Sequence, residues 1–334
     1  MKLAGTTVLV TGGAGFIGSH LVEGLLAENS EVYVLDNLST GKSENLSACE
    51  KNKNFHFVFG DITNPQDIRK AMKGIDIVFH LATLGVRHSI KHPFENHRVN
   101  AEGTLSLLEE ARRQNISRFI YCSSSEVYGT AQYVPMTEEH PTLPHTVYGA
   151  SKLAGESYAR AYYETYRLNT CVIRPFNTFG PRSHYEGEAG EMIPKSIVRA
   201  LNGQPILIFG SGTQTRDFTY VEDTARGLLE AAKNSAMIGR TLNIGSNFEI
   251  SIKDLAQKII NQIGHRLSKL EYVEGRPGDV MCLRADARKF KELTSWSPQV
   301  SFEEGLQRTL EWFKTSYKNP KELLKQETGM NWKP

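Results

Sequence analysis

The segment VLVTGGAGFIGSH, residues 8–20, restricts the fold more than any other part of the sequence. Its apolar start is typical of a buried strand, and apolar residues return at helical spacing after the glycines. In such a turn the first glycine permits a tight bend, the second lets backbone approach a pyrophosphate, and the third lets the helix pack on the strand. The free N–H groups at the helix start also attract phosphate. The pattern predicts a dinucleotide site built from Gly12, Gly15, Phe16, Ile17 and Gly18.

Short apolar runs alternate with helical stretches through the first half of the chain. Strands are predicted at 7–12, 31–36, 54–61, 76–82, 118–126 and 169–177, and helices at 16–28, 65–73, 96–114 and 148–166. Strands separated by helices indicate parallel pairing, and nearly continuous apolar strands indicate a sheet that is covered on both faces. The predicted fold class is therefore α/β, a doubly wound parallel sheet of the Rossmann type.

The pattern changes after about residue 178. Residues 177–192 are rich in glycine and polar residues and are long enough to form a functional loop. A helix at 193–202, a strand at 205–209, a helix at about 221–233 and a strand at 241–246 are predicted next, followed by small helices and strands to about 316. We expect a Rossmann domain over 1–177, to which 213–250 returns, and a smaller C-terminal α/β region over 178–334 that covers the C-terminal edge of the sheet.

The overall composition argues against several functions. The 334 residues carry 39 basic and 37 acidic side chains, a formal net charge of +2, so no concentrated basic stripe for nucleic acid is expected. The four cysteines form no CxxC pair, so no metal site is predicted, and scattered cysteines are compatible with a reducing compartment. No secretion signal and no apolar run of membrane-spanning length is visible, so we expect a cytoplasmic protein without a membrane partner.

Two aspartates at strand ends carry the prediction about the cofactor. Asp36 ends the second strand, 18 residues after Gly18, where a carboxylate can accept two ribose hydroxyls and repel a 2′-phosphate. This favours NAD over NADP, with a helix-capping or loop aspartate as the alternative. Asp61 is assigned to the adenine amino group, with a turn residue as the alternative. Residues beside the strand ends complete the predicted cofactor site: Asn37, Ile62 and Leu81.

A tyrosine and a lysine four residues apart form the candidate catalytic pair. Tyr148 and Lys152, in the segment YGASK, share one face of a predicted helix. A nearby ammonium and a positive nicotinamide both stabilise a phenolate, so we expect the pKa of Tyr148 to fall toward neutrality. Such a tyrosine acts as a general base toward a hydroxyl. Most Tyr-x-x-x-Lys pairs are surface or packing residues, but here Ser123, Ser124 and Ser125 end the strand just upstream.

Five motifs together resemble one family. TGGAGFIG, DNLSTG, SSSEVYG, YGASK and RPFNTFGPR are similar, in order and spacing, to the extended short-chain dehydrogenase/reductase family, and within it to NAD-dependent nucleotide-sugar epimerases, dehydratases and decarboxylases. The resemblance runs from about residue 6 to 315. It implies that Tyr148 removes the proton of the C4 hydroxyl while hydride passes to NAD. It also implies that Lys152 holds the nicotinamide ribose and that Ser124 is the catalytic serine.

The resemblance assigns substrate roles as well. Asn177 would contact the sugar or phosphate, while Arg216 and Arg276 would bind the nucleotide diphosphate, which needs cationic partners with several donors. Arg182 is placed near the phosphates with them. An arginine such as Arg216 or Arg276, taken alone, is more often a solvated surface charge. The region from 178 onward would then form the nucleotide-sugar site.

The residues after Ser124 bear on which reaction follows. Ser125 and Glu126 stand where 4,6-dehydratases carry Asp-Glu, and a Ser-Glu pair resembles that of uronic acid decarboxylases. The stretch HLATLGVRHSI, with Arg87, resembles UDP-glucuronate 4-epimerases instead, and Arg87 would meet either a substrate carboxylate or a neighbouring acid. Glu126 is assigned a catalytic role, with a structural carboxylate as the alternative.

These resemblances favour one reaction among several. We expect a 4-epimerase that acts on a UDP-hexose or UDP-hexuronate through a transient 4-keto sugar. UDP-glucuronate decarboxylase and NDP-hexose 4,6-dehydratase are the alternatives, and a non-catalytic NAD-binding regulator is a further one. The resemblance also implies a homodimer formed through the helices predicted at 96–114 and 148–166.

Overall fold

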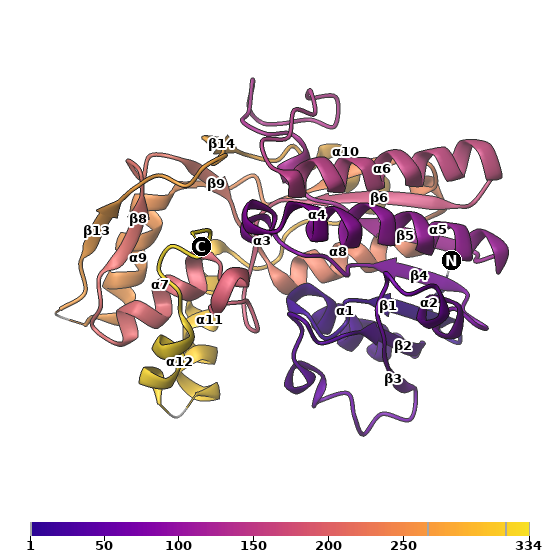
Figure 1. The fold of residues 1–334 in the computed structure, drawn as a ribbon, viewed down its shortest axis with the longest axis horizontal. Coiled ribbons are helices and arrows are strands. Elements are labelled where there is room, and N and C mark those ends of the chain that lie inside the picture. Colours follow the sequence, from indigo (N-terminus) through magenta and orange to yellow (C-terminus); the bar gives the residue numbers. More distant parts are fainter. Residues whose placement is uncertain (1, 266, 318, 334) are drawn as a thin grey trace.

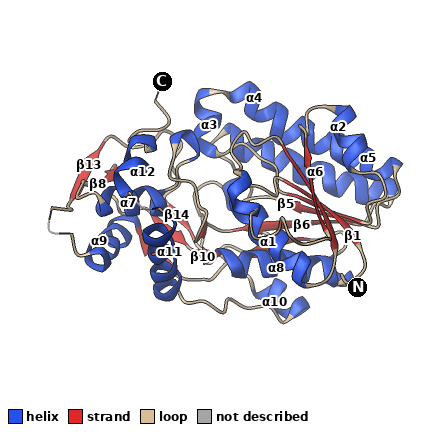
Figure 2. Ribbon diagram, turned by 90° about the horizontal axis from the view of Figure 1, so that it is seen from below, coloured by secondary structure: helices blue, strands red, loops and turns tan. Residues whose placement is uncertain are grey.

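The computed structural model describes residues 2–265, 267–317 and 319–333. Seven strands form one parallel sheet in the order β11-β6-β5-β4-β1-β2-β3, with helices on both faces (Figures 1 and 2). The strands are β1 (Thr7–Thr11), β2 (Glu31–Asp36), β3 (Phe55–Phe59), β4 (Ile77–His80), β5 (Arg118–Cys122), β6 (Thr170–Pro175) and β11 (Thr241–Ile244). The predicted doubly wound fold is confirmed. In this topology, the strand order reverses beside β1, and ligands bind outside the carboxyl ends of the strands there.

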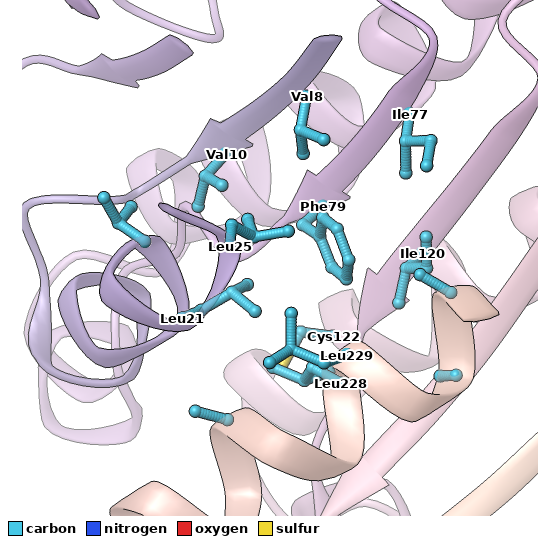
Figure 3. Close-up of a cluster of buried hydrophobic side chains, with 14 of the residues drawn as sticks. Val8, Val10, Leu21, Leu25, Ile77, Phe79, Ile120, Cys122, Leu228 and Leu229 are labelled. Atoms are coloured by element: carbon cyan, nitrogen blue, oxygen red, sulfur yellow. The ribbon is translucent and has the colours of Figure 1, made fainter. Parts of the chain in front are cut away.

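Both faces of the sheet are buried. Val8 and Val10 of β1 face α1 (Phe16–Ala27) and α8 (Val221–Lys233), whose leucines close this layer (Figure 3). Leu9, between the two valines, belongs to the opposite cluster with side chains of α5 (Gly103–Arg113). Since neighbouring residues of a strand point to opposite faces, a strand with apolar residues at every position is buried on both. Each fully buried side chain of this size contributes roughly 1.5–3 kcal/mol.

The predicted helix at 96–114 is divided in the structure. It consists of α4 (Pro93–His97), a wide π-type turn at Arg98–Glu102, and α5, which starts at a glycine. The short helix α3 (Val86–Lys91) before it was not predicted. The other helices of this half lie close to their predicted ranges: α2 (Pro65–Ala71) and α6 (Val147–Tyr166).

The strand predicted at 118–126 is shorter than expected. It ends at Cys122, and Ser125–Val127 form a short 3-10 turn. The Ser124 hydroxyl accepts a hydrogen bond from the Glu126 N–H at 3.2 Å and so caps this turn. The Ser123 N–H still donates to the Ile173 carbonyl oxygen of β6, and the capped turn then takes the chain from Ser124 onward out of the sheet.

The second half of the chain has a core of its own and also returns to the sheet. Helices α7 (Met192–Leu201), α9 (Ile252–Ile263), α11 (Phe302–Ser316) and α12 (Pro320–Gln326) enclose a separate apolar cluster. The small strands beside them are β8 (Ile206–Phe209) paired with β13 (Leu270–Val273), and β9 (Thr215–Asp217) between β12 (Glu249–Ser251) and β14 (Cys282–Leu283). Two further strands, β7 (Thr178–Phe179) and β10 (Thr219–Tyr220), pair with each other, and α10 (Arg288–Thr294) lies against β11. α8 packs on α1, and β11 extends the sheet. The domain boundary at residue 177 stays a prediction.

Candidate active site

A cavity of about 470 Å³ lies between the carboxyl ends of the sheet strands and the second half of the chain. All but one of the residues predicted to bind cofactor or substrate, or to act in catalysis, line this cavity. They are Gly12, Gly15, Phe16, Ile17, Gly18, Asp36, Asn37, Asp61, Ile62, Leu81, Arg87, Ser124, Ser125, Glu126, Tyr148, Lys152, Asn177, Arg216 and Arg276. Arg182 is the exception. One continuous cavity therefore brings together residues that are far apart in the sequence.

The glycine turn has no room for side chains. Gly12 has φ +71°, and a Cβ atom there would lie 2.6 Å from the Ala82 nitrogen. A Cβ on Gly18 would lie 2.1 Å from the Gly12 carbonyl oxygen. The turn therefore exposes bare backbone at the start of α1, where unpaired N–H groups favour a phosphate. This bare cradle fits the pyrophosphate of NAD.

Asp36 is held at the edge of the cavity beside the glycine turn. Its two carboxylate oxygens accept hydrogen bonds from the Ala14 N–H at 2.9 Å and the Leu38 N–H at 2.8 Å. Burial raises the pKa of Asp36, while these two hydrogen bonds oppose the shift. Each oxygen can still accept another donor. The geometry fits a carboxylate that receives the ribose hydroxyls of NAD.

Asp61 lies on the neighbouring strand end and contacts Asn37. It accepts hydrogen bonds from the Thr63 N–H at 2.7 Å and from the Asn37 side-chain amide at 2.9 Å. Burial acts to raise the pKa of Asp61, but the hydrogen bonds outweigh it and lower the pKa. The carboxylate therefore stays ionised at the adenine end of the predicted cofactor site.

The candidate catalytic pair, Tyr148 and Lys152, lies on the first turns of α6. Lys152 is 2% exposed, and its Nζ donates a 2.6 Å hydrogen bond to the Cys122 carbonyl oxygen. Burial lowers the pKa of Lys152 to about 8. The Tyr148 hydroxyl is hydrogen-bonded to the Ser124 side chain. The structure thus brings the serine, tyrosine and lysine of the prediction together.

One expectation about Tyr148 is not met by the protein chain itself. Burial raises the pKa of its phenol well above the usual range, and only the hydrogen bond with Ser124 acts strongly in the other direction. Charges on Glu126 and Glu191 raise the pKa further. The protein chain alone therefore does not lower this pKa, and the positive nicotinamide named in the expectation would have to supply the shift.

One charged side chain that the sequence analysis did not single out, Glu191, also lines the cavity. Glu191, which precedes α7, is close enough to raise the pKa of Tyr148 by its charge. Arg87 faces this acidic pair of Glu126 and Glu191; burial lowers its pKa to about 10, and the carboxylates oppose that shift. In the part of the chain that the structure describes, no hydrogen bond or ion pair holds the Arg87 guanidinium. Helical spacing gave no signal for Glu191, because it stands in a loop before the helix.

A single carboxylate joins the two arginines of the predicted diphosphate site. Asp279 Oδ1 lies 2.7 Å from Arg216 Nη2 and 2.6 Å from Arg276 Nη2. The two guanidiniums come from β9 and from the segment GRPGD, 60 residues later in the chain. The sequence contained this carboxylate within GRPGD but gave no reason to assign it a partner. Asp279 holds both cations at one end of the cavity.

Asn177 lies at the wall between the two halves of the chain. Its side-chain amide donates to the Asp217 carbonyl oxygen at 3.3 Å. The Asp217 carboxylate is fully buried and accepts the backbone N–H groups of Ser246, Asn247 and Ala285. Asp217 therefore ties backbone segments together beside the site.

Arg182 lies outside the cavity, contrary to its assignment to the phosphates. Its Nη2 forms a 2.6 Å ion pair with Glu23 of α1, and the adjacent Pro181 carbonyl oxygen lies 3.1 Å from the His20 ring nitrogen. The partners are 159 and 161 residues away in the sequence, so no local pattern could reveal them. Arg182 fastens the loop at residues 180–191 to the helix that follows the glycine turn.

The same loop is held at three further places. Lys42 lies in the loop after β2. Its Nζ atom is 3.0 Å from Glu186 and 5.0 Å from the centre of the Tyr185 ring. Lys91 of α3 pairs with Glu188 at 3.1 Å. The Asn331 amide donates to three carbonyl oxygens, those of Gly187, Glu188 and Gly190. Residues 184 and 188–191 line the cavity, so this fastened loop is one of its walls.

Lys195 and Arg199 of α7 mark another part of the wall. Both pair with Glu327, at 3.3 Å and 2.9 Å. The Lys195 ammonium also donates to the Thr328 and Gly329 carbonyl oxygens. The segment after α12 is thereby anchored beside the cavity, although its partners lie more than 120 residues earlier in the chain.

Two other kinds of site were sought in the described residues. Within them, no group of three or more His, Cys, Asp or Glu side chains is arranged to hold a metal ion. Over the same residues, no helix has the length and apolar character needed to cross a membrane.

Comparisons with known proteins identify the family. The family model described as GDP-mannose 4,6 dehydratase matches residues 9–309. A Mycolicibacterium smegmatis protein named UDP-glucose 4-epimerase is 37% identical over 310 residues, covering 92% of this chain and 98% of that protein. A Danio rerio protein named UDP-glucuronic acid decarboxylase 1 is 34% identical over 312 residues, covering 92% of this chain and 72% of that protein.

A solved structure agrees with this relationship. DesIV from Streptomyces venezuelae, a dTDP-glucose 4,6-dehydratase solved with NAD and TYD bound, matches the fold with a TM-score of 0.88 and 32% identity, covering 92% of this chain and 97% of that one. The resemblance inferred from the motifs is confirmed, and NAD is the cofactor of this group of enzymes. The chain belongs to the GDP-mannose 4,6-dehydratase family of NAD-dependent, extended short-chain dehydrogenases/reductases.

Proposed function

We propose that this protein is an NAD-dependent nucleotide-sugar 4-epimerase that acts on a UDP-hexose or UDP-hexuronate. One observation carries the proposal: Ser124, Tyr148 and Lys152 converge in a cavity that also contains the glycine cradle and the Arg216–Arg276 pair. A nucleotide sugar bound there would have its sugar ring between the tyrosine and the cofactor.

The chain's own groups supply the proton chemistry. Bound NAD supplies reversible hydride acceptance at the sugar carbon. Tyr148 takes the proton of the C4 hydroxyl and later returns it, while Ser124 hydrogen-bonds the same oxygen. Lys152, one helical turn after Tyr148, adds positive charge to the same cavity and is positioned by the Cys122 carbonyl oxygen. With NAD bound to supply that chemistry, these residues would support inversion of the configuration at C4.

The second end of the cavity fits a nucleotide diphosphate. Arg216 and Arg276 present guanidiniums that can bind phosphate oxygens with two parallel hydrogen bonds each. Asn177, at the wall between the halves of the chain, is assigned to the sugar or the adjacent phosphate. Arg182 has no part in this proposal, because its guanidinium pairs with Glu23.

Two observations favour a uronate over a neutral sugar and keep decarboxylation as the second candidate. Arg87 faces the cavity without a hydrogen-bond or ion-pair partner among the described residues, so a substrate carboxylate would neutralise it. Ser125, 3% exposed, replaces an acid that 4,6-dehydration would need, while Glu126 stays beside Tyr148. A 4-keto uronate is a β-keto acid, which can either lose carbon dioxide or be reduced on the other face.

Product analysis tests the reaction directly. Purified protein is incubated with NAD and, separately, UDP-glucose, UDP-N-acetylglucosamine and UDP-glucuronate, and the products are measured by mass and by sugar NMR. Unchanged mass with inverted C4 supports epimerisation, whereas loss of carbon dioxide or of water would replace it with decarboxylation or dehydration. The variant Tyr148→Phe should retain NAD and lose turnover by roughly 10²–10⁴-fold. A wild-type protein that binds NAD and converts none of these sugars would indicate a regulator.

The assembly and location complete the proposal. We infer a homodimer formed through α5 and α6, which pack side by side and leave Leu105 and Tyr166 exposed. Size measurement under native conditions tests this assembly. All four cysteines are free thiols, which supports work in the reducing cytoplasm; fractionation of the source cells tests that location.

A further inference from the structure

Three consecutive residues at the end of β5 are each tied to α6. Lys152 donates to the Cys122 carbonyl oxygen at 2.6 Å, and the Ser123 hydroxyl donates to Glu156 at 2.5 Å. The third tie joins the side chains of Ser124 and Tyr148. Residues 148, 152 and 156 are spaced four apart and therefore share one face of the helix. The strand end therefore meets one face of the helix at three positions, with Cys122 opposite Lys152 between the Ser124–Tyr148 and Ser123–Glu156 contacts.

The Ser123–Glu156 contact is held in place by further buried side chains. Glu156 accepts two hydrogen bonds from Arg174 of β6, at 2.8 Å and 2.6 Å. Arg174 also donates to the Tyr128 hydroxyl at 2.8 Å, and that hydroxyl donates to Asn243 of β11 at 2.7 Å. These residues are at most 6% exposed. A fully hydrogen-bonded buried network of this kind fixes its members in one arrangement.

We propose that Ser123 and Glu156 are positioning residues that set the approach of Ser124 to Tyr148. Neither is a catalytic residue: the Glu156 carboxylate is bound to Arg174 and Ser123, and the Ser123 hydroxyl is bound to Glu156. Ser123 is adjacent in sequence to Ser124, and Glu156 lies two helical turns after Tyr148. Holding Ser123 at a fixed separation from Glu156 therefore holds Ser124 at a fixed separation from Tyr148. The proposal rests on the assignment of Tyr148 as the base.

The variant Ser123→Ala removes this tie and leaves the Arg174–Glu156 ion pair intact. We expect kcat to fall roughly 10- to 100-fold, because small misplacements of reacting groups have effects of that size. KM and NAD content should stay at wild-type values, since the glycine cradle and the arginines are untouched. A second variant, Glu156→Asp, keeps the charge opposite Arg174 but shortens the reach to Ser123, and should show the same loss of kcat.

The pH profile gives a readout that loss of stability alone would not change. The phenolate is the reactive form, so kcat rises with pH through the pKa of Tyr148. The hydrogen bond with Ser124 lowers that pKa, so its loosening should move the rising limb of the profile to higher pH. The other charged or titratable groups around the phenol, which both variants retain, are Cys122, Glu126, Lys152 and Glu191.

A matched control exists at the other end of the same helix. The Thr170 hydroxyl of β6 donates to the Ala159 carbonyl oxygen of α6 at 2.8 Å and is also buried. Thr170→Val removes a strand-to-helix hydrogen bond of the same kind, far along α6 from Tyr148. We expect Thr170→Val to lower thermal stability about as much as Ser123→Ala and to keep the wild-type kcat and pH profile.

Several results would overturn the proposal. Wild-type kcat and an unmoved pH limb in both Ser123→Ala and Glu156→Asp would do so, as would an equal loss of kcat in Thr170→Val. A crystal structure of Ser123→Ala measures the separation of the Ser124 and Tyr148 hydroxyls directly, and an unchanged separation contradicts positioning whatever the role of Tyr148. Full turnover by Tyr148→Phe would instead refute the proposed function, so the two failures are distinguishable.

Discussion

The Lys152 ammonium donates a 2.6 Å hydrogen bond to the Cys122 carbonyl oxygen and lies 4.6 Å from the centre of the Tyr121 ring. It is almost fully buried, and burial lowers its pKa to about 8 from 10.5. At pH values between these two pKa values, Lys152 is protonated in the unfolded chain and has released its proton in the folded chain. Stability contributed by this group therefore rises with pH across that interval.

The first prediction uses this difference. From pH 8 to 10.5, the free energy of unfolding of the cofactor-free wild type should rise, relative to Lys152→Met, by an amount on the order of 3 kcal/mol. Urea unfolding of both proteins at a series of pH values measures the relative slope. Parallel curves for the two proteins would contradict the buried, proton-releasing lysine.

The second prediction concerns Asp36 and cofactor choice. Asp36→Asn removes the negative charge and leaves one side-chain oxygen, which can accept from the N–H group of either Ala14 or Leu38 but not from both as the two carboxylate oxygens do. NAD affinity should fall roughly 10- to 100-fold, because hydrogen bonds to a charged group contribute about 1.5–3 kcal/mol. NADP affinity should fall less or rise, since the repulsion of a 2′-phosphate is gone. Calorimetric titration with each cofactor measures both; an equal loss for NAD and NADP would refute the ribose role.

The third prediction concerns the fastened loop at residues 180–191. Lys42→Ala removes the contacts with Glu186 and Tyr185, so the dissociation of NAD should accelerate roughly two- to tenfold. Release of NADH, followed by its fluorescence after dilution, measures the rate. Lys258→Ala is the matched control, because Lys258 pairs with Glu303 at a similar 3.1 Å outside the cavity. Equal acceleration in both variants would show that the loop contact has no special role.

The fourth prediction separates substrate classes. Arg87→Gln should raise KM for UDP-glucuronate roughly 10- to 100-fold, because a charged hydrogen bond of about 1.5–3 kcal/mol is lost. KM for UDP-glucose should change little, since this sugar offers no carboxylate. Steady-state kinetics with the two substrates provides the test. A similar rise for both sugars would show that Arg87 shapes the cavity without recognising a carboxylate.

The glycine turn and the catalytic pair could be predicted because their physical causes are local. A strand, three glycines and a helix are contiguous in the sequence, so the cradle at Gly12 and Gly18 follows from short-range geometry. Tyr148 and Lys152 share a helix face by spacing alone. The alternation of apolar strands and helices likewise predicts a doubly wound parallel sheet. The strand order on either side of β1 confirms this topology.

Contacts between distant segments were beyond this reasoning. Arg182 was assigned to phosphate, but its partner Glu23 lies on α1. Glu327 meets Lys195 and Arg199 only because the segment after α12 returns to the cavity wall. The sequence also shows the lysine near Tyr148 but not the depth of burial, which raises the pKa of the phenol in the protein chain alone. Charge pairing across more than 100 residues is a property of the packed fold.

Asp279 has a consequence for turnover. Two guanidiniums brought together without it would repel each other and would grip a diphosphate with two full positive charges. With the carboxylate between Arg216 and Arg276, the cluster carries one net positive charge and is already in place before a ligand arrives. In the proposed function, such a site would attract a diphosphate and, because Asp279 competes for the same donors, would also let the converted molecule leave.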